Sequence, residues 1–403
     1  MSPEAPPWYR WLLLSGVWIQ YAAFGLVATS LAPLTGLIES DLKLTHAEMG
    51  TTMGAWQLVY IVSAIPCGIL LDRLGPRWAL TIGSLLIALS VFARGTADSF
   101  IELILAVMLF GLGGPIISAG APKIIAEWFT GSSRGLAMGI YMTGPAMGGL
   151  VSLTMTHSIL LPVLDGVWQS VMFLWAGVAV FAAIIWLVVT SHPVMRVSSG
   201  SGVAGSGLPQ TRVLIRLVKN PAVLLLLIMS VGVFLFNHGL NNWLPELLRS
   251  SGMTLIEAGY WAAIPTVIGL AGSLLIPRLA TPERRFYILA GLSLASAFAS
   301  VLLHFQAPSL LFTGLLLQGI ARSSLMTILV LTLVELPGIE EKNVGVATGL
   351  FFSAAEVGGV LGPMSLGLLY DWTNGFNTGL FMLTGVAMMI FLGTLRLKRL
   401  CRG

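Results

Sequence analysis

Long apolar runs constrain the fold of this chain more than any other feature. A bilayer core about 30 Å thick requires about 20 apolar residues in a helix, and the 403-residue sequence contains repeated runs of this length. They are expected at approximately 11–37, 48–71, 78–97, 101–128, 135–160, 168–190, 221–247, 256–279, 286–304, 308–335, 344–370 and 377–395. The sequence therefore predicts an all-α integral membrane protein with twelve transmembrane helices.

The composition points to lipid as the solvent. Hydrophobic residues make up 56% of the chain and charged residues only 9%, whereas soluble proteins carry roughly a quarter charged residues. A segment inside lipid must pair every backbone N–H and C=O internally, and a helix does so within itself. The alternating segments of about ten residues that are typical of membrane barrels do not occur in the sequence.

The basic residues predict an orientation. If the N-terminus is cytoplasmic, sixteen of the 21 Lys and Arg residues fall on the cytoplasmic side. Three fall outside (Lys43, Arg94 and Arg249), and two lie within spans (Lys123 and Arg322). Cytoplasmic loops of membrane proteins carry such an excess of positive charge. We therefore expect a multi-pass protein of the plasma (inner) membrane with both termini in the cytoplasm.

One connection differs from the others. Residues 191–220 contain the run Val-Ser-Ser-Gly-Ser-Gly-Val-Ala-Gly-Ser-Gly at 197–207, and small polar residues of this kind form flexible linkers. This composition predicts an N-terminal bundle of six helices at 1–190, a cytoplasmic linker at 191–220 and a C-terminal bundle of six helices at 221–403.

The two predicted bundles share an internal repeat. The stretch Leu44–Gly50 before the second span resembles Met253–Gly259 before the eighth, at an offset of 209. The stretch Arg134–Gly139 resembles Val344–Gly349 at an offset of 210. Because six spans are an even number, the halves have parallel topology. Two related halves around a site at mid-bilayer are typical of alternating-access transporters.

Two motifs carry a resemblance to a known family. The stretch from Gly68 to Arg77 reads Gly-Ile-Leu-Leu-Asp-Arg-Leu-Gly-Pro-Arg, and the stretch from Gly144 to Gly149 reads Gly-Pro-Ala-Met-Gly-Gly. They resemble the loop motif and the glycine–proline helix motif of the major facilitator superfamily. In place of the Arg that often marks the fourth span, this chain has Val107. The resemblance therefore does not imply that the fourth span relays protons.

Within that superfamily, the segments at 121–129 and 236–245 are most similar to cyanate and nitrate/nitrite type porters and to oxalate/formate type exchangers. The resemblance implies a monomeric secondary active transporter without a cofactor. Its cargo would be a small organic or inorganic anion such as a monocarboxylate, moved with proton coupling or by exchange. The alternatives are an exporter of hydrophobic or drug-like compounds and a receptor that does not transport.

The loop motif predicts a cytoplasmic gate. An anion at Asp72 can accept from the N–H groups at the start of a neighbouring helix. Arg73 and Arg77 can pair with Glu127, and the second half repeats the arrangement around Glu335 with Arg278, Arg284 and Arg285. Arg134, at the start of the fifth span, belongs to the same gating set. Basic residues at cytoplasmic helix ends also satisfy the positive-inside rule without any gate.

Arg322 is the most informative single residue. A charged side chain near the middle of a span costs free energy, so its presence there indicates a functional role. In one interpretation its planar fork binds a carboxylate or oxyanion of the substrate. In the other it pairs with Glu356, which lies at similar depth in the next span. A carboxylate at that depth resists ionisation when it is unpaired, so Glu356 is also the candidate for proton coupling.

Further polar residues are candidates to line the substrate path. The seventh span carries Asn237, His238 and Asn241 close to Gly239 and Pro245, a combination typical of broken helices beside a transport path. Gln20, Tyr21 and Gln57 are the candidates in the first two spans. The alternative interpretation of these residues in the seventh span is a solvated outer gate that does not contact substrate.

Several functions have no support in the sequence. No GxxxxGK[ST] nucleotide loop, HExxH zinc motif or GxSxG nucleophile motif occurs. The two cysteines have no ligand-like spacing, so neither a metal site nor a cofactor is expected. No basic and aromatic cluster of the kind that binds nucleic acid is present. We therefore expect no enzyme, and only a small solute and the lipid bilayer as partners.

Overall fold

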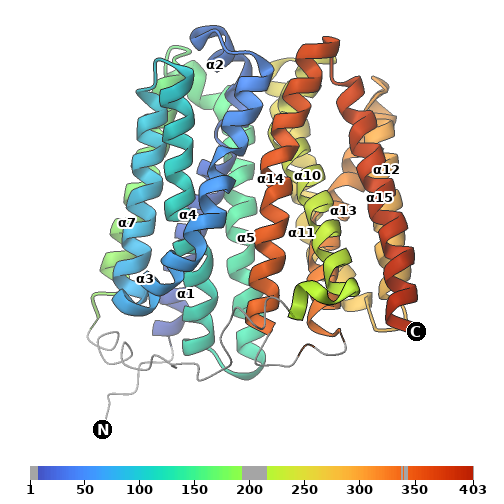
Figure 1. Cartoon of the computed structure of the whole chain (residues 1–403). Coiled ribbons are helices and arrows are strands. Elements are labelled where there is room, and N and C mark those ends of the chain that lie inside the picture. Colours follow the sequence, from blue (N-terminus) through green and yellow to red (C-terminus); the bar gives the residue numbers. More distant parts are fainter. Residues whose placement is uncertain (1–7, 193–215, 337–338, 340–343, 403) are drawn as a thin grey trace. The chain divides into compact units, whose positions relative to one another are not determined.

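The computed structural model describes residues 8–192, 216–336, 339 and 344–402, and this part of the chain is almost entirely helical (Figure 1). The first half contains α1 (Tyr9–Thr29), η1 (Ala32–Leu34), α2 (Thr35–Leu42), α3 (His46–Gly95), α4 (Phe100–Trp128), α5 (Gly131–Met155), η2 (Thr156–Leu160), α6 (Leu161–Val163) and α7 (Trp168–Val189). The second half contains α10 (Pro221–Ser250), α11 (Leu255–Leu279), α12 (Arg285–Leu302), α13 (Pro308–Val334), α14 (Val344–Thr373) and α15 (Asn377–Arg402).

Helix α3 accounts for two of the predicted spans. Its 50 residues would extend about 75 Å at 1.5 Å per residue, far more than a bilayer core. Gly75 interrupts it with φ 71° and ψ 165°, a backbone conformation that glycine adopts without steric cost. The described residues contain 11 helices long and apolar enough to cross a membrane. Because the break at Gly75 divides one of them, the twelve predicted spans are confirmed.

Contacts divide the chain into two compact units. The first holds the chain up to Leu44 and from Ala55 through α7, and the second holds α10 to α15 together with Thr45–Gly54, the first turns of α3. The prediction of an N-terminal bundle at 1–190 did not place Thr45–Gly54 in the second unit. Most of the predicted linker at 191–220 lies outside the described residues, so the domain boundaries stay a prediction.

Glycines let two helices touch through their backbones in each unit. A Cβ on Gly148 of α5 would lie 1.9 Å from the Ala22 carbonyl oxygen of α1. A Cβ on Gly358 of α14 would lie 1.9 Å from the Val231 carbonyl oxygen of α10. The offsets, 358 − 148 = 210 and 231 − 22 = 209, are those of the internal repeat. The repeat therefore conserves the close helix pair that small residues permit in membranes.

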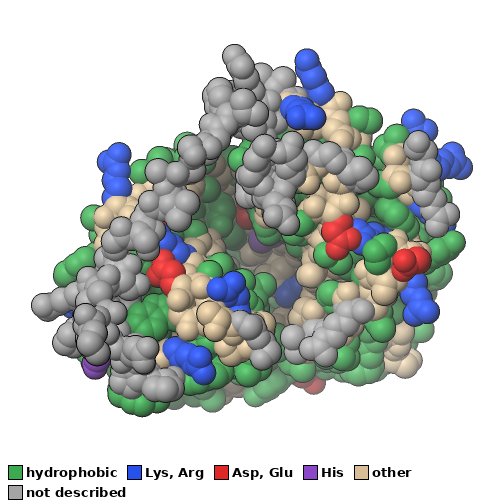
Figure 2. All heavy atoms as spheres, turned by 90° about the horizontal axis from the view of Figure 1, so that it is seen from below, with side chains coloured by type: hydrophobic (Ala, Val, Ile, Leu, Met, Phe, Trp, Pro, Cys, Tyr) green, Lys and Arg blue, Asp and Glu red, His purple; other side chains and the backbone are tan. Residues whose placement is uncertain are grey.

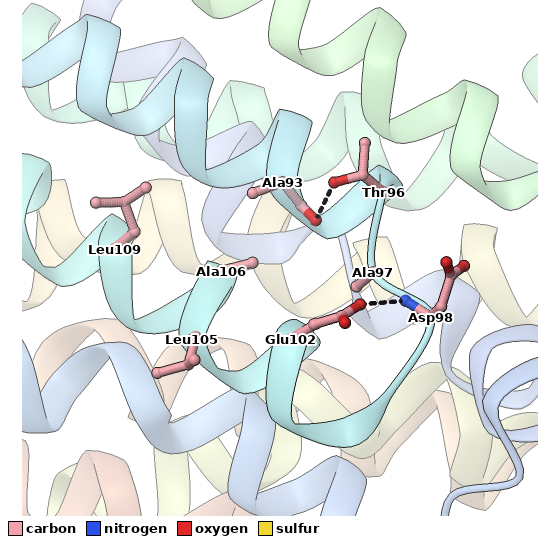
Figure 3. Close-up of a pocket in the computed structure, with 8 residues that line it drawn as sticks. All are labelled: Ala93, Thr96, Ala97, Asp98, Glu102, Leu105, Ala106 and Leu109. Carbon is pink, nitrogen blue, oxygen red and sulfur yellow. Dashed lines mark hydrogen bonds between the residues drawn. The ribbon is translucent and has the colours of Figure 1, made fainter.

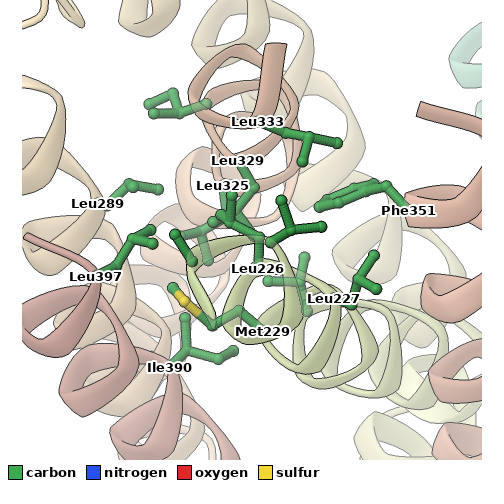
Figure 4. Packing of buried hydrophobic residues seen from close by; sticks show 14 of the residues in the cluster. Leu226, Leu227, Met229, Leu289, Leu325, Leu329, Leu333, Phe351, Ile390 and Leu397 are labelled. Carbon is green, nitrogen blue, oxygen red and sulfur yellow. The ribbon is translucent and has the colours of Figure 1, made fainter. Parts of the chain in front are cut away.

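The interior of the second unit is an apolar cluster built from five helices (Figure 4). Leu226 and Met229 of α10, Leu325 of α13, Phe351 of α14 and Ile390 of α15 are all buried within it. Lipid tails are as apolar as these side chains, so close packing and dispersion rather than exclusion of water stabilise such an interior. The cluster gives α10 and α13 a fixed mutual position.

Arg94 does not lie in an outer loop, where the sequence analysis placed it. Its side chain is only 1% exposed, at the end of α3. Its guanidinium donates from Nη1 to the Val27 carbonyl oxygen at 3.0 Å and to Ser30 Oγ at 3.1 Å, and from Nη2 to Ser90 Oγ at 3.3 Å. Val27 lies in the last turn of α1, where carbonyl groups have no partner within the helix and the dipole favours a cation. Arg94 therefore ties α3 to the end of α1.

We expect Arg94→Ala to lower the stability of the folded protein. Hydrogen bonds from a charged donor contribute about 1.5–3 kcal/mol each, and the substitution removes several of them. The melting temperature of the purified protein in detergent should fall by several degrees, while the exposed control Arg396→Ala should leave it unchanged. Equal melting temperatures for both variants would contradict the structural role of Arg94.

Candidate substrate site

Helices α10 and α13 bring Arg322 together with two asparagines. Arg322 Nη1 donates to Asn241 Oδ1 at 2.7 Å, and Asn237 Nδ2 donates to the Arg322 carbonyl oxygen at 3.3 Å. Asn237 and Asn241 are four residues apart and so lie on one face of α10. Three of the residues predicted to bind substrate are therefore neighbours. The two asparagines touch Arg322 itself, so they position the guanidinium and its backbone.

The charge of Arg322 has no acidic partner. Within the described part of the chain its guanidinium forms no ion pair, and its side-chain acceptor, Asn241, is a neutral amide. The alternative in which Arg322 pairs with Glu356 is therefore not what the structure shows. A half-buried cation left with unused donors at mid-span is suited to bind an anion.

Glu356 is buried on α14 without a protein partner for one of its oxygens. The residue is 7% exposed, and its Oε2 accepts no hydrogen bond. An isolated carboxylate is far more costly to bury than a carboxylic acid. Glu356 is therefore a buried carboxyl group within a span that the described protein groups do not fully satisfy.

A residue that the sequence analysis missed lies one turn before Arg322. Gln318 is fully buried, and both its amide oxygen and its amide nitrogen lack a hydrogen-bond partner. Asn237 Oδ1 is also buried without a partner. Buried polar groups are nearly always hydrogen-bonded, and each exception costs about 1–3 kcal/mol. The spacing of four residues between Gln318 and Arg322 was the available signal in the sequence.

His238 lies beside this cluster on α10. Its ring packs against Phe234 with centroids 5.1 Å apart, and its carbonyl oxygen accepts from Asn242 Nδ2 at 2.9 Å. His238 is the neighbour in sequence of Asn237, whose Nδ2 donates to the Arg322 carbonyl oxygen.

The candidates of the first unit lie in an aromatic setting. Tyr21 on α1 stacks on Phe24 with centroids 5.6 Å apart, and it approaches Tyr141 on α5 at 5.4 Å. The adjacent Gln20 is 1% exposed, and neither atom of its amide has a partner. Gln57 on α3 is fully buried. Tyr141 was not predicted, and its contact with Tyr21 depends on the packing of α1 against α5.

The residues predicted to form a cytoplasmic gate make other pairs than those expected. Asp72 accepts from Lys123 Nζ at 2.6 Å, and the predicted pairs of Arg73 and Arg77 with Glu127 are not among the ion pairs of the described residues. The flexible stem of Lys123, one turn before Glu127, lets its ammonium reach Asp72. Lys123, which was predicted as a span cation, therefore contacts Asp72, a residue of the predicted gating set.

Two further residues of the predicted gating set have defined partners. Arg134 donates from Nε to the Phe129 carbonyl oxygen and from Nη2 to the Ala126 carbonyl oxygen, both at 2.8 Å, so it caps the end of α4. In the second unit, Arg285 forms an ion pair with Glu335, as the repeat suggested. Lys, Arg, Asp and Glu side chains are visible on the face seen from below (Figure 2). The cytoplasmic orientation of this face stays a prediction.

A surface pocket of the first unit does not involve any of these candidates. It has a volume of about 550 Å³ and lies between the end of α3 and the start of α4 (Figure 3). Glu102 on its wall accepts from the backbone N–H of Asp98 at 2.8 Å, and its own N–H donates to Ser99 Oγ, the cap of α4, at 3.4 Å. Leu105 on another wall is more than half exposed. The pocket is lined by residues at the surface of the first unit, and none of the candidate substrate residues is among them.

Comparison with known proteins agrees with this architecture. The sequence profile described as Major Facilitator Superfamily matches residues 17–363. The chain belongs to the Major Facilitator Superfamily. It is accordingly a multi-pass membrane transporter and not an enzyme, as the resemblance of its loop and helix motifs predicted.

Superfamily relatives include carriers of sugar acids. The chain is 23% identical to the hexuronate transporter of Bacillus subtilis, over 99% of this chain and 96% of the relative. It is 25% identical to the probable galactarate/D-glucarate transporter GudP of Escherichia coli, over 87% and 84%. It is also 23% identical to a quinolone resistance transporter of Acinetobacter baumannii, over 87% and 84%.

Among solved structures, that of the nucleoside transporter NupG superposes on this chain with a TM-score of 0.77. The match covers 96% of this chain and 98% of NupG, at 14% identity. At this identity the likeness shows a shared fold only.

Asn241→Asp tests whether the free charge of Arg322 serves transport. The new carboxylate would lie at hydrogen-bond distance from the guanidinium and neutralise it, so we expect uptake of an anionic substrate to fall at least ten-fold. Asn220→Asp is the control on the same helix, because Asp also caps a helix N-terminus and Asn220 accepts only from the Ala222 N–H. Normal anion uptake by Asn241→Asp would separate Arg322 from substrate binding.

Proposed function

We propose that this chain is a secondary active transporter of small organic anions, with polyhydroxylated carboxylates as the preferred class. The observation that carries the proposal is the Arg322 guanidinium at mid-span, bonded to the neutral amide of Asn241 and, in the described part of the chain, to no carboxylate. Two relatives are named as transporters of hexuronate and of galactarate/D-glucarate, and these sugar acids carry the group that Arg322 would recognise.

The chemistry of the cluster fits such a substrate. A guanidinium presents parallel N–H donors that match the two oxygens of a carboxylate. Asn241 occupies one of these donors, so a substrate carboxylate would compete with the Asn241 amide and not with a charged side chain. Asn237 and Gln318 each retain at least one unpaired amide atom. Such atoms are suited to hydroxyl groups, which both donate and accept hydrogen bonds.

Glu356 supports proton coupling within the proposal. An anion bound at Arg322 compensates one charge, and a proton on Glu356 removes the other. The carrier with anion and proton bound would then have fewer uncompensated charges at mid-bilayer than the empty carrier when it changes conformation. This matches symport of an anion with a proton. Exchange of one anion for another is the competing mode, and it requires no change of charge on Glu356.

The second candidate function is export of hydrophobic or drug-like compounds. The relative from Acinetobacter baumannii, named a quinolone resistance transporter, supports it. The two functions differ in the residue on which they depend. A cationic cargo would be repelled by Arg322 and bound by an ionised Glu356, so loss of Arg322 should spare export and abolish anion uptake.

Arg322→Ala should abolish uptake of a sugar acid. Removal of two charge-assisted hydrogen bonds weakens binding by about 3 kcal/mol or more, which is about a hundred-fold in affinity. Proteoliposomes supplied with labelled glucuronate, glucarate, neutral glucose and a quinolone distinguish the candidates. Arg396→Ala, which removes an exposed arginine at the far end of α15, is the control. Undiminished glucuronate uptake by Arg322→Ala would exclude the proposed site.

Glu356→Gln should separate proton coupling from substrate binding. The amide has nearly the same shape but cannot exchange a proton. We expect uptake driven by an inward proton gradient to fall by at least ten-fold, while exchange of labelled for unlabelled substrate continues without a gradient. Uptake is measured with and without the gradient in the same liposomes. If gradient-driven uptake persists in this variant, Glu356 is not the proton carrier.

A further inference from the structure

The last two turns of α15 carry a group of basic residues that the repeat counterpart of this helix lacks. Residues 395–402 read Leu-Arg-Leu-Lys-Arg-Leu-Cys-Arg. The counterpart is α7, since Asn377 and Trp168 begin the two helices and 377 − 168 = 209. No Lys or Arg occurs between residues 168 and 195. The repeat predicts that both helices end on the same side of the membrane, so topology alone does not account for the basic end of α15.

The start of α12 is basic as well, although the N-terminus of a helix disfavours cations. Arg284 is the N-cap residue of α12 and Arg285 is its first residue, and the first turn contains no acidic side chain. The helix dipole places partial positive charge at this end. Arg285 is compensated by its ion pair with Glu335, whereas Arg284 is exposed and forms no ion pair with a described residue. An external anion would compensate Arg284.

The basic ends of α12 and α15 lie together at the edge of the second unit (Figure 1). Lys398 Nζ is 3.9 Å from the centroid of the Tyr287 ring, and Tyr287 is 63% exposed. Arg284 lies one turn before Tyr287, on the same face of α12. Farther along the two helices, Thr384 Oγ1 donates to Ser300 Oγ at 3.0 Å. Arg284, Tyr287 and Lys398 are called the basic cluster below.

The positive charge of the basic cluster has no protein anion to balance it. Lys398 forms no ion pair with a residue that the structure describes. A cation–π contact with an exposed ring is weak, and it leaves the Lys398 ammonium with N–H donors for an anion. The nearest acid in sequence to Arg284 is Glu283, and a hydrogen bond from the Thr281 side chain lowers the pKa of the Glu283 carboxyl group. Lys and Arg side chains are visible at the right-hand margin of Figure 2.

An apolar surface extends from the basic cluster along both helices. On α12, Gly291 lies four residues after Tyr287 and therefore on the same face. The space beside Gly291 is open, because a Cβ there would meet no atom within 4 Å. On α15, Leu395 and Met388 lie three and ten residues before Lys398, on its face of the helix, and they are 42% and 38% exposed. Exposed apolar side chains within a span are suited to contact acyl chains.

We propose that the basic cluster binds an anionic phospholipid, with the lipid phosphate at Lys398 and Arg284 and an acyl chain along Gly291 and Leu395. Basic residues beside a membrane span attract anionic headgroups. A soluble phosphate would leave the apolar surface uncovered, and a neutral lipid would leave the two cations uncompensated. The inference goes beyond the proposed function, because it does not depend on the cargo.

Removal of charge tests the headgroup contact. The purified protein is titrated with phosphatidylglycerol or with phosphatidylcholine of the same acyl chains, and bound lipid is counted by native mass spectrometry. Each cation near an anionic lipid surface contributes about five-fold in affinity, so Arg284→Gln combined with Lys398→Gln should weaken phosphatidylglycerol binding at least ten-fold. Lys219→Gln combined with Arg396→Gln is the control. It removes two exposed cations outside the cluster, and binding should stay unchanged.

A pair of glycine substitutions tests the acyl-chain contact without altering any charge. Gly291→Leu fills the open space beside the basic cluster, and we expect phosphatidylglycerol to bind about five-fold more weakly. Gly385→Leu adds the same side chain to open space on α15, roughly 140° around the helix from Lys398, and should bind as the wild type does. This pair decides the question if the double charge variant does not elute as a monodisperse protein.

Four results would overturn the proposal. The first is equal affinity of the wild type for the two lipids, and the second is equal phosphatidylglycerol affinity of the wild type, the double charge variant and Gly291→Leu. The third is displacement of bound phosphatidylglycerol by excess inorganic phosphate, which would assign the cluster to a soluble anion. The fourth is a dimer without bound lipid that the double charge variant dissociates, which would assign this surface to a second copy of the chain.

Discussion

The absence of water around most of the chain is the constraint on which the rest of this structure depends. Each backbone N–H and C=O inside lipid must find a partner in the protein, and helices provide one for every residue except those at their ends. At the helix ends, therefore, particular side chains are needed to bond the unpaired backbone groups. Arg94 meets the last turn of α1, Arg134 that of α4, and Asp371 the first turn of α3. Each of these polar contacts joins a helix end to a neighbouring segment.

Polar side chains that do not serve helix ends stand out against this background. Arg322, Glu356 and Gln318 lie within spans. Among the described residues, the Gln318 amide and one Glu356 oxygen are buried without a hydrogen-bond partner, and Arg322 forms no ion pair. Such groups lower the stability of the fold, and a transporter that must bind and release a polar cargo requires them. Arg322 and Asn241 show the arrangement most clearly, since a neutral amide holds the guanidinium in place without cancelling its charge.

The glycine contacts explain how helices of this chain approach one another at backbone distance. Gly148 against Ala22 and Gly358 against Val231 join helices inside a unit, at equivalent places of the repeat. Gly50 against Pro363 uses the same kind of close contact, but there it holds a segment whose continuation belongs to the other unit. An interface made mainly of backbone surface holds two helices close together without intervening side chains.

The sequence by itself determined the number of spans, the twofold repeat and the family, because hydropathy and small-residue spacing are local or periodic properties. It also selected Arg322 and Glu356, since any ionisable residue within an apolar run is conspicuous. Only the tertiary structure decided the partners. Lys123 and not an arginine meets Asp72, Asn241 and not Glu356 meets Arg322, and Arg94 is buried at the end of α1. The physical reason is that the partner of a long side chain depends on how neighbouring helices are rotated and shifted. That geometry is set by close contacts such as those of Gly148 and Gly358, which no hydropathy pattern records.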